Sequence, residues 1–385
     1  MVRVSARASI PPFFAMEMAG LAERRVAAGA HVLHLEVGQP SSGAPRGARE
    51  AAATALLDRT LGYTTALGIP QLRARIARHY GEWYGVDVDP NRVIVTAGAS
   101  AGFVLAFLAS FDEGDRVGVT EPGYPCYRNT LLAVGAEPVG IPLGPEHNYR
   151  LTTTLLERAA DLDALRGLVV ASPSNPTGTV MSADDLALIA DHCAERRMTL
   201  IADEIYHGIT YTGRASSILQ HTTEAIVLNS FSKYFAMTGW RLGWIIAPDA
   251  LVAPIERFAQ NLYICAPHVS QVAGLAAFDC TAELERNVAS FACKRNVLLD
   301  GLHAAGMFDV APADGAFYAY VDVSHLTADS FELCRTWLDE IDVAVTPGVD
   351  FDPVRGHRFV RFSCAGPEDD IEEAMRRIGA WIRAR

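Results

Sequence analysis

A lysine flanked by hydroxyl side chains is the feature of this sequence whose residue types and spacing most clearly suggest chemistry. Lys233 follows an apolar run in "IVLNSFSKYFAMTGWR", with Ser230 and Ser232 just before it and Arg241 eight residues after it. A lysine amine becomes reactive when its site lowers its pKa from about 10.4, and imine formation is its characteristic covalent use. Two hydroxyls and a guanidinium suit a phosphate group. The stretch therefore suggests a site for a phosphorylated aldehyde, with a solvated loop lysine as the simpler alternative.

Asp203 ends a second apolar run, "TLIAD". A buried carboxylate without a partner is costly. A protonated pyridine nitrogen would be a suitable partner, because the carboxylate would keep the ring cationic and able to accept electrons. The alternative is a structural aspartate that caps the following segment. Glu204, the next residue, would point to the other side of a strand and is expected to be structural.

Short apolar runs alternate with helix-length amphipathic stretches through the first part of the chain. The runs cover residues 93–96, 116–120, 168–172, 199–203 and 225–230. This alternation predicts a mostly parallel sheet with helices on both faces. Each run stops at small or polar residues, and ligands bind beyond the carboxyl ends of such strands. A helix beginning near Ser100 would add free backbone N–H groups for an anion.

Composition and charge exclude several classes of protein. The chain has 33 basic and 45 acidic residues and no Lys/Arg-rich run, so we expect no nucleic-acid partner. Its seven cysteines include no C-x-x-C pair, which indicates reduced thiols and a cytoplasmic location. Residues 93–111 carry no charge, but Gly98, Ser100 and Gly102 interrupt them, so we predict strand, turn and helix and no membrane span. We also expect no metal, since the histidines form no H-E-x-x-H motif and no Cys/His ligand cluster.

Seven short strings carry a resemblance to a known family. They are "YTTALGIPQLR" (63–73), "TAGASAG" (96–102), "EPGYPCY" (121–127), "SPSNPTG" (172–178), "DEIY" (203–206), "SFSKYFAMTGWRLGW" (230–244) and "RFSCA" (361–365). In type and order they resemble the pyridoxal-phosphate-dependent aminotransferases of class I/II, fold type I, over nearly the whole chain.

The resemblance implies a two-domain α/β fold. Residues 46–282 would form the large domain, which binds pyridoxal phosphate on a mostly parallel, seven-stranded sheet flanked by helices. The pattern changes beyond about residue 280 to a long charged helix, strand-like segments and a terminal helix. Residues 283–385 would therefore form a smaller α+β domain, which the N-terminal segment 1–45 joins.

The resemblance also implies roles for single residues around the cofactor ring. Lys233 matches the Schiff-base lysine, and Asp203 matches the partner of the pyridine nitrogen. Asn175 and Tyr206 match the pair that hydrogen-bonds the phenolic oxygen, and Tyr124 matches the aromatic residue that stacks on the ring. The catalytic set implied in this way is Lys233, Asp203 and Tyr206.

Further matches concern the phosphate and the substrate. The phosphate ligands implied by the resemblance are Ala99, Ser100, Ser230, Ser232 and Arg241. Tyr63 matches a tyrosine that reaches the phosphate of the neighbouring subunit, which implies a homodimer. Arg361 matches the arginine that binds the substrate carboxylate, Gly38 a backbone contact at the same end, and Asn175 is expected to bind the substrate as well.

The predicted reaction is amino transfer between an L-amino acid and a 2-oxo acid, in two half-reactions. Lys233 would move the proton from the α-carbon as general base and acid. One alternative is a lyase on the same scaffold, which would catalyse β-elimination or cyclopropane formation. A second is a sensor that binds the cofactor without turnover, although all matched catalytic positions are filled, which favours an enzyme.

Other positions in the sequence indicate which substrate side chain the site accepts. Some acidic-substrate members of the family have a lysine just after the phosphate-binding turn, where this chain has Ala101. Candidates for an apolar side-chain pocket are Phe13, Phe14, Tyr124 and Tyr263. We therefore expect a neutral amino acid as one substrate. His207 lies next to Tyr206, and we expect it behind the site or at the surface, with a catalytic role as the alternative.

Overall fold

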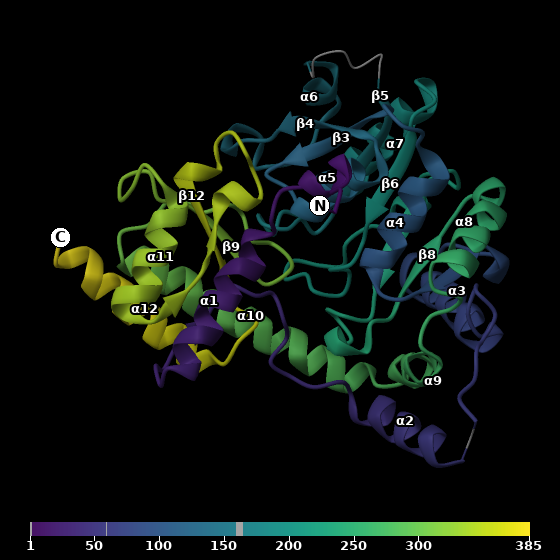
Figure 1. Cartoon of the computed structure of the whole chain (residues 1–385), viewed down its shortest axis with the longest axis horizontal. Helices are drawn as coiled ribbons and strands as arrows, with labels where there is room; N and C mark the ends of the chain where they lie inside the picture. The colour runs from purple at the N-terminus through teal and green to yellow at the C-terminus, as the bar shows by residue number, and fades with distance from the viewer. Residues whose placement is uncertain (1, 59, 159–164) are drawn as a thin grey trace.

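A seven-stranded sheet forms the centre of the larger part of the molecule (Figure 1). The computed structural model describes residues 2–58, 60–158 and 165–385. The strands lie in the order β2-β8-β7-β6-β5-β3-β4. Their bounds are β2 (Val93–Thr96), β3 (Arg116–Glu121), β4 (Glu137–Pro142), β5 (Leu165–Ala171), β6 (Thr199–Asp203), β7 (Ile226–Ser230) and β8 (Gly243–Ile246). Strand β8 runs antiparallel to both of its neighbours, and the other pairs are parallel. The predicted α/β fold with a mostly parallel sheet is confirmed.

The five predicted strands are present, and β4 and β8 join them. Strand β4 lies at the edge of the sheet and contains Pro138 and Pro142, a composition that an edge strand tolerates because its outer N–H groups need no ladder partner. Strand β8 begins two residues after Arg241 and pairs with β7 through Ser230 and Gly243. The pairing brings the lysine-containing stretch and Arg241 back to the same edge of the sheet.

Helices cover both faces of the sheet. Alternate residues of the inner strands belong to different apolar clusters: Ile201 packs with one cluster, and Leu200 and Ala202 pack with the other. On one face lie α4 (Ala99–Ser110), α5 (Pro125–Val134) and α8 (Asp249–Leu262). On the other lie α3 (Pro70–Tyr84), α7 (Ala183–Glu195) and α9 (His268–Ala277), with the short α6 (Thr153–Arg158) beside α7. No helix among the described residues is long and apolar enough to cross a membrane.

A smaller unit combines the two ends of the chain. Strand β1 (Leu33–His34) pairs with β10 (Val343–Ala344), and an antiparallel sheet has the order β11-β12-β9. Its strands are β9 (Tyr318–Asp322), β11 (Thr346–Pro347) and β12 (Phe359–Ser363). Around them lie α1 (Phe14–Ala27), α10 (Thr281–Ala304), α11 (Ser330–Ile341) and α12 (Glu368–Arg383), while α2 (Arg46–Asp58) packs on α9.

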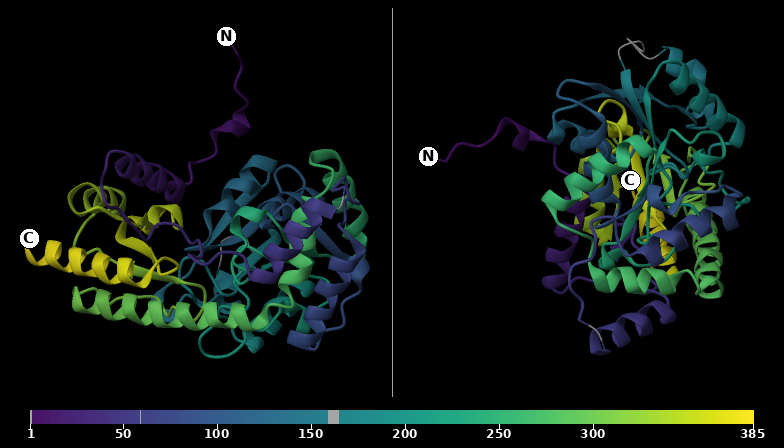
Figure 2. Two further views of the ribbon diagram at one scale, coloured as in Figure 1. Left: turned by 90° about the horizontal axis from the view of Figure 1, so that it is seen from below. Right: turned by 90° about the vertical axis from the view of Figure 1, so that its right-hand side faces the viewer.

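Figures 1 and 2 show the purple α1 beside the yellow-green C-terminal elements, with α10 running from this unit towards α9. The pairing of β1 with β10 and the packing of α1 on β11 tie the N-terminal segment to the C-terminal one. We therefore propose that residues 1–45 and 283–385 form a small domain and residues 46–282 a large one.

Candidate active site

A cavity of about 350 Å³ opens where the carboxyl ends of the parallel strands face the smaller unit. Asp203 ends β6, and Lys233 lies just beyond β7. Arg361 reaches the cavity from β12. Among the predicted site residues, those that line the cavity are Gly38, Ala99, Ser100, Tyr124, Asn175, Asp203, Tyr206, Lys233 and Arg361.

The Lys233 amine lies inside this cavity. Its Nζ donates a hydrogen bond to the carbonyl oxygen of Gly38 at 2.7 Å, and it lies 5.8 Å from the ring centroid of Tyr206. Burial lowers the pKa of Lys233 to about 8, with the charges of Arg361 and Arg241 acting in the same direction and Asp203 opposing them. A much larger fraction of this amine is therefore neutral at physiological pH than of an ordinary lysine.

The Asp203 carboxylate is held by two donors. The Tyr127 hydroxyl donates to Oδ2, and the backbone N–H of Ile205 donates to Oδ1 at 3.0 Å. Burial raises the pKa of Asp203 to about 6, and the hydrogen bond from Tyr127 opposes this shift. A carboxylate that is fixed and desolvated in this way is suited to a cationic partner in the cavity.

Two tyrosine hydroxyls meet near the lysine. The Tyr206 and Tyr318 hydroxyls lie 2.8 Å apart in a hydrogen bond. Gly38 is packed against the same hydroxyl, since a Cβ atom at Gly38 would lie 1.7 Å from the Tyr318 oxygen. Tyr318 therefore fixes both the Tyr206 ring and the backbone of the segment that accepts the Lys233 hydrogen bond.

Arg361 is an almost fully buried cation, with 3% of its surface exposed. Nη1 donates to Asn175 Oδ1 at 2.9 Å, and Nη2 donates to the carbonyl oxygen of Glu36 at 2.5 Å. The aromatic rings of Tyr318 and Phe351 lie against the guanidinium, at 4.3 Å and 4.8 Å. Its Nε has no hydrogen-bond partner within the described part of the chain. A buried guanidinium with a free N–H is a ready site for a carboxylate.

The start of α4 and Arg241 form the opposite end of the site. A Cβ atom at Gly98, which has φ +82°, would lie 2.5 Å from Arg241 Nη2, so the guanidinium lies directly against the turn before α4. The first N–H groups of a helix lack intrahelical partners and favour anions. The side chain of Arg241 also donates to the carbonyl oxygen of Thr238 at 3.0 Å. This end therefore combines a cation with free backbone donors, as a phosphate group requires.

Several predicted residues do not line the cavity of the single chain. Ser230, Ser232 and Arg241 are not part of its wall. Ser230 and Ser232 are buried, and the Ser230 hydroxyl donates to Ser232 Oγ at 2.8 Å. Tyr63 is 82% exposed. Phe14 instead packs edge-on against Phe331, at 5.4 Å between ring centroids.

Some of the residues expected in the substrate side-chain pocket lie elsewhere, and His207 is placed only partly as expected. Phe13 and Tyr124 line the cavity and contact each other edge to face, whereas Tyr263 does not line it. His207 is buried behind the sheet, where Nδ1 bonds the Tyr84 hydroxyl at 2.7 Å, so it is neither at the surface nor in the cavity.

Sequence reasoning missed two tyrosines of the site. Tyr127 lies three residues after Tyr124, on the same helical face, so the string "EPGYPCY" contained a signal for it. Tyr318 lies in an apolar strand whose pattern gives no sign of a cavity. The cavity wall also includes Met16, Phe103 and Val104, which sequence alone does not separate from the core.

Comparisons with known proteins agree with this geometry. The family model "Aminotransferase class I and II" matches residues 30–378. The valine–pyruvate aminotransferase of Mycobacterium tuberculosis is 50% identical over 385 residues, which cover 99% of this chain and 98% of the relative. The (5-formylfuran-3-yl)methyl phosphate transaminase of Methanocaldococcus jannaschii is 33% identical, over 96% of each chain. The crystal structure of an aminotransferase from Mycobacterium tuberculosis superposes with a TM-score of 0.97 and 49% identity, over 100% of both chains. The resemblance is confirmed: the chain belongs to the class I and II aminotransferase family and is an aminotransferase.

Proposed function

We propose that this aminotransferase moves the amino group between a neutral aliphatic L-amino acid, valine in the first place, and pyruvate, with pyridoxal 5'-phosphate bound in the cavity. One observation supports the proposal that the substrate is a neutral amino acid. Within the described residues of one chain, Lys233 and Arg361 are the two lysine or arginine side chains that line the cavity. If Lys233 serves the cofactor and Arg361 the α-carboxylate, no cation remains for a second carboxylate. The name of the Mycobacterium tuberculosis relative supports the same pair of substrates.

The residues at the cavity fit pyridoxal phosphate. Lys233 offers an amine with a lowered pKa, and the buried Asp203 offers a carboxylate to the ring nitrogen. Arg241 and the N-terminus of α4 offer donors to the phosphate. Pyridoxal phosphate, when bound, supplies an electron sink for the negative charge that develops at the substrate α-carbon.

Arg361 selects the bond that reacts by orienting the substrate. Its free Nε–H would donate to the α-carboxylate, while Asn175 and Glu36 keep the guanidinium in place. A carboxylate held in this way is retained, which leaves the α-proton as the group to be removed. The apolar wall of Phe13, Met16 and Phe103 would then receive the substrate side chain.

Lys233 is the group that moves the proton. Its Nζ, with a pKa near 8, would accept the α-proton as general base and return it as general acid. Asp203 would hold a proton at the ring nitrogen, and Tyr206 and Asn175 would offer a hydroxyl and an amide to the phenolic oxygen. Removing Lys233 should therefore abolish proton transfer while the fold persists.

We also propose a cytoplasmic homodimer, in which Tyr63 completes the phosphate site of the partner subunit. Tyr63 is exposed in the single chain, and Leu56 and Leu57, seven and six residues before it in the sequence, are 64% and 87% exposed. Exposed apolar residues of this size on one side of a molecule favour association. A monomer in light-scattering measurements of the holoenzyme would contradict this proposal.

A panel of amino donors with pyruvate as the acceptor tests the function. Valine should give its 2-oxo acid and an equal amount of alanine, with kcat/KM at least about tenfold above that for aspartate, whose second carboxylate finds no cation. Lys233→Ala is the matched inactive control. Release of ammonia without need for an acceptor would identify a lyase, and a preference for aspartate would contradict the proposed substrate class.

A further inference from the structure

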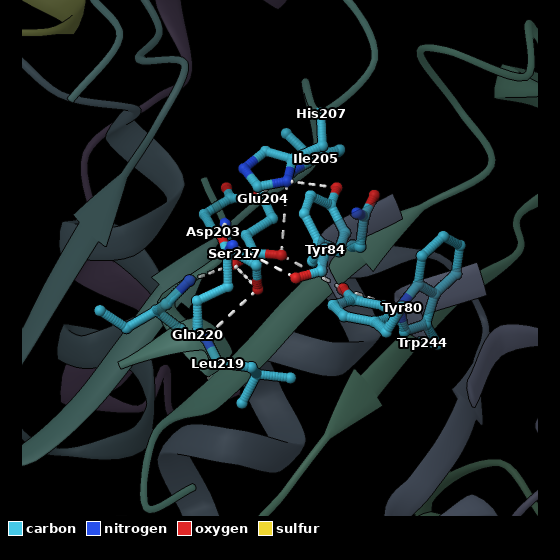
Figure 3. Close-up of polar contacts among 12 residues, drawn as sticks. Tyr80, Tyr84, Asp203, Glu204, Ile205, His207, Ser217, Leu219, Gln220 and Trp244 are labelled. Carbon is cyan, nitrogen blue, oxygen red and sulfur yellow. Dashed lines mark hydrogen bonds and ion pairs between the residues drawn. The ribbon is translucent and has the colours of Figure 1, made fainter. Parts of the chain in front are cut away.

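A buried carboxylate that the mechanism above does not use lies directly behind the active site. Glu204 follows Asp203 at the end of β6, and successive residues of a strand point to opposite faces. Asp203 lines the cavity, whereas Glu204 faces the core and is 3% exposed. Figure 3 shows its carboxylate at the centre of a group of polar side chains, with Tyr80, Tyr84 and His207 on one side and Ser217 on another.

Three donors from two other elements hold this carboxylate. On Oε1 it accepts hydrogen bonds from the Ser217 hydroxyl at 2.7 Å and the Ile218 N–H at 2.9 Å, at the start of the short helix η5 (Ile218–Gln220). On Oε2 it accepts a hydrogen bond from the Tyr80 hydroxyl of α3 at 3.2 Å. The indole of Trp244 in β8 lies behind this hydroxyl, with Nε1 3.4 Å from it. The geometry is that of a site prepared for a carboxylate.

No described cation neutralises Glu204. His207 Nδ1 lies 3.5 Å from Oε2, but burial lowers the pKa of His207 to about 3, so the ring is neutral. Tyr80 and Tyr84, also on this side, are neutral, because burial raises the pKa of both phenols, and Tyr84 bonds His207. Burial raises the pKa of Glu204 to about 7, and the bonds from Ser217, Ile218 and Tyr80 oppose this shift. A buried charge of this kind destabilises the fold. If packing were the only role of this residue, a neutral side chain of the same shape would be sufficient.

The backbone connects this network to Asp203. The N–H of Glu204 donates to the carbonyl oxygen of Leu228 in β7 at 2.8 Å, and the N–H of His207 donates to the carbonyl oxygen of Glu204 at 2.9 Å. Within the same turn the Ile205 N–H donates to Asp203 Oδ1. Burial is the main cause of the raised pKa of Asp203. The negative charge of Glu204 raises this pKa further.

We propose that Glu204 is a positioning residue for Asp203. The Glu204 carboxylate anchors the turn after β6 from the core side, and its negative charge strengthens the hold of Asp203 on a proton shared with the cofactor ring. This inference rests on the proposed binding of pyridoxal phosphate and does not depend on which amino acid is the substrate. Removing the charge makes the proton easier to lose, and removing the anchor loosens the carboxylate that holds it.

The test uses holoenzyme loaded with pyridoxal phosphate that carries ¹⁵N at the ring nitrogen. In Glu204→Gln, which keeps the size of the side chain, we expect the acid dissociation constant read from the ¹⁵N shift to rise at least about threefold, because the negative charge that Glu204 carries above its pKa of about 7 is lost. The kcat of the half-reaction should fall while the KM for the amino acid stays within about twofold, since Arg361 is untouched. Tyr80→Phe, which keeps the carboxylate but removes one donor, should shift the constant in the same direction by less.

Ser330→Ala is the matched control, because it removes an equally buried hydroxyl, which donates to the carbonyl oxygen of Gly356 in the small unit. It should leave the ¹⁵N titration unchanged. An unchanged titration in Tyr80→Phe and in any folded Glu204→Gln would overturn the proposal, even if the variants lose stability. Failure of the proposed function is a separate result, because wild-type enzyme would then bind no pyridoxal phosphate or show no transfer from valine.

Discussion

The Tyr127 hydroxyl donates a hydrogen bond to the Asp203 carboxylate, from a ring that is packed between Phe103 and Tyr124. The same tyrosine thus contacts the aromatic ring that faces the cavity and the carboxylate at its base. Because Asp203 receives its other donor from the backbone of Ile205, Tyr127 is the side chain that sets the direction of the carboxylate.

Replacing Tyr127 by Phe should weaken cofactor binding more than it perturbs packing. The variant keeps the ring but removes the donor that opposes the effect of burial, so the pKa of Asp203 should rise above its present value of about 6. The lost bond to a charged group should cost about 1–2 kcal/mol in the free energy of unfolding, measured with urea. The dissociation constant for pyridoxal phosphate should increase, because less of the carboxylate is ionised. Tyr211→Phe, which removes a hydroxyl bonded to the backbone of Ala316, is the control and should leave that constant unchanged.

Lys233 should make the stability of the cofactor-free enzyme rise with pH. Its pKa is about 8 in the folded chain and 10.5 in the reference state, so between these values the unfolded chain holds a proton that the folded chain lacks. The free energy of unfolding therefore increases with pH in this window, by about 1.5 kcal/mol between pH 8 and 9.5. Lys233→Met lacks this contribution and should be more stable than wild type near pH 7. The difference between the two proteins should shrink as the pH approaches 10, and a difference that is constant across this range would contradict the lowered pKa.

Arg361→Lys should raise the KM for every amino acid while the fold is retained. A lysine can supply charge, but it cannot keep the bonds to Asn175 and Glu36 and also offer the free Nε–H. We expect a loss of about 10- to 100-fold in kcat/KM, measured for the amino-donor half-reaction with valine and with alanine. Similar losses for both donors are expected, because both have the α-carboxylate. A loss confined to one of them would place Arg361 at the side chain and not at the carboxylate.

Much of the site could be predicted because it lies at strand ends. Asp203, Asn175 and Lys233 each follow an apolar run, and the carboxyl ends of parallel strands converge on one edge of the sheet. Such positions depend on local sequence and on one topological rule. The family motifs added the roles, since a string such as "SNPTG" by itself reads only as a turn.

The remaining residues depend on tertiary pairing that no local pattern encodes. Tyr318 reaches the cavity because β9 pairs with β12, which places it in the sheet that contains Arg361. Glu204 was expected to be structural, and its donors come from α3 and η5, which lie 124 and 13 residues away along the chain. Strand β4 was missed because its prolines are typical of loops and are tolerated only at an edge.

Asp350 should control the wall that α1 contributes to the side-chain pocket. Its buried carboxylate accepts the N–H of Phe14 at 3.1 Å and of Ala15 at 3.0 Å, so it caps the start of α1 from a distant part of the chain. Phe13 and Met16, next to these bonds, line the cavity. Asp350→Ala should cost about 1–2 kcal/mol in the free energy of unfolding, as lost helix caps do. It should also raise the KM for valine several-fold relative to that for alanine, whose methyl group makes less contact with the wall.

A second helix cap separates this effect from a general loss of stability. Asp329 caps α11 through the N–H groups of Phe331 at 2.9 Å and Glu332 at 3.3 Å, and it does not line the cavity. Asp329→Ala should therefore lower stability by a similar amount and leave the ratio of the two KM values unchanged. If both variants changed this ratio equally, the α1 cap would have no special link to the substrate. A change confined to Asp350→Ala would show that the contact between the two ends of the chain shapes the pocket for the substrate side chain.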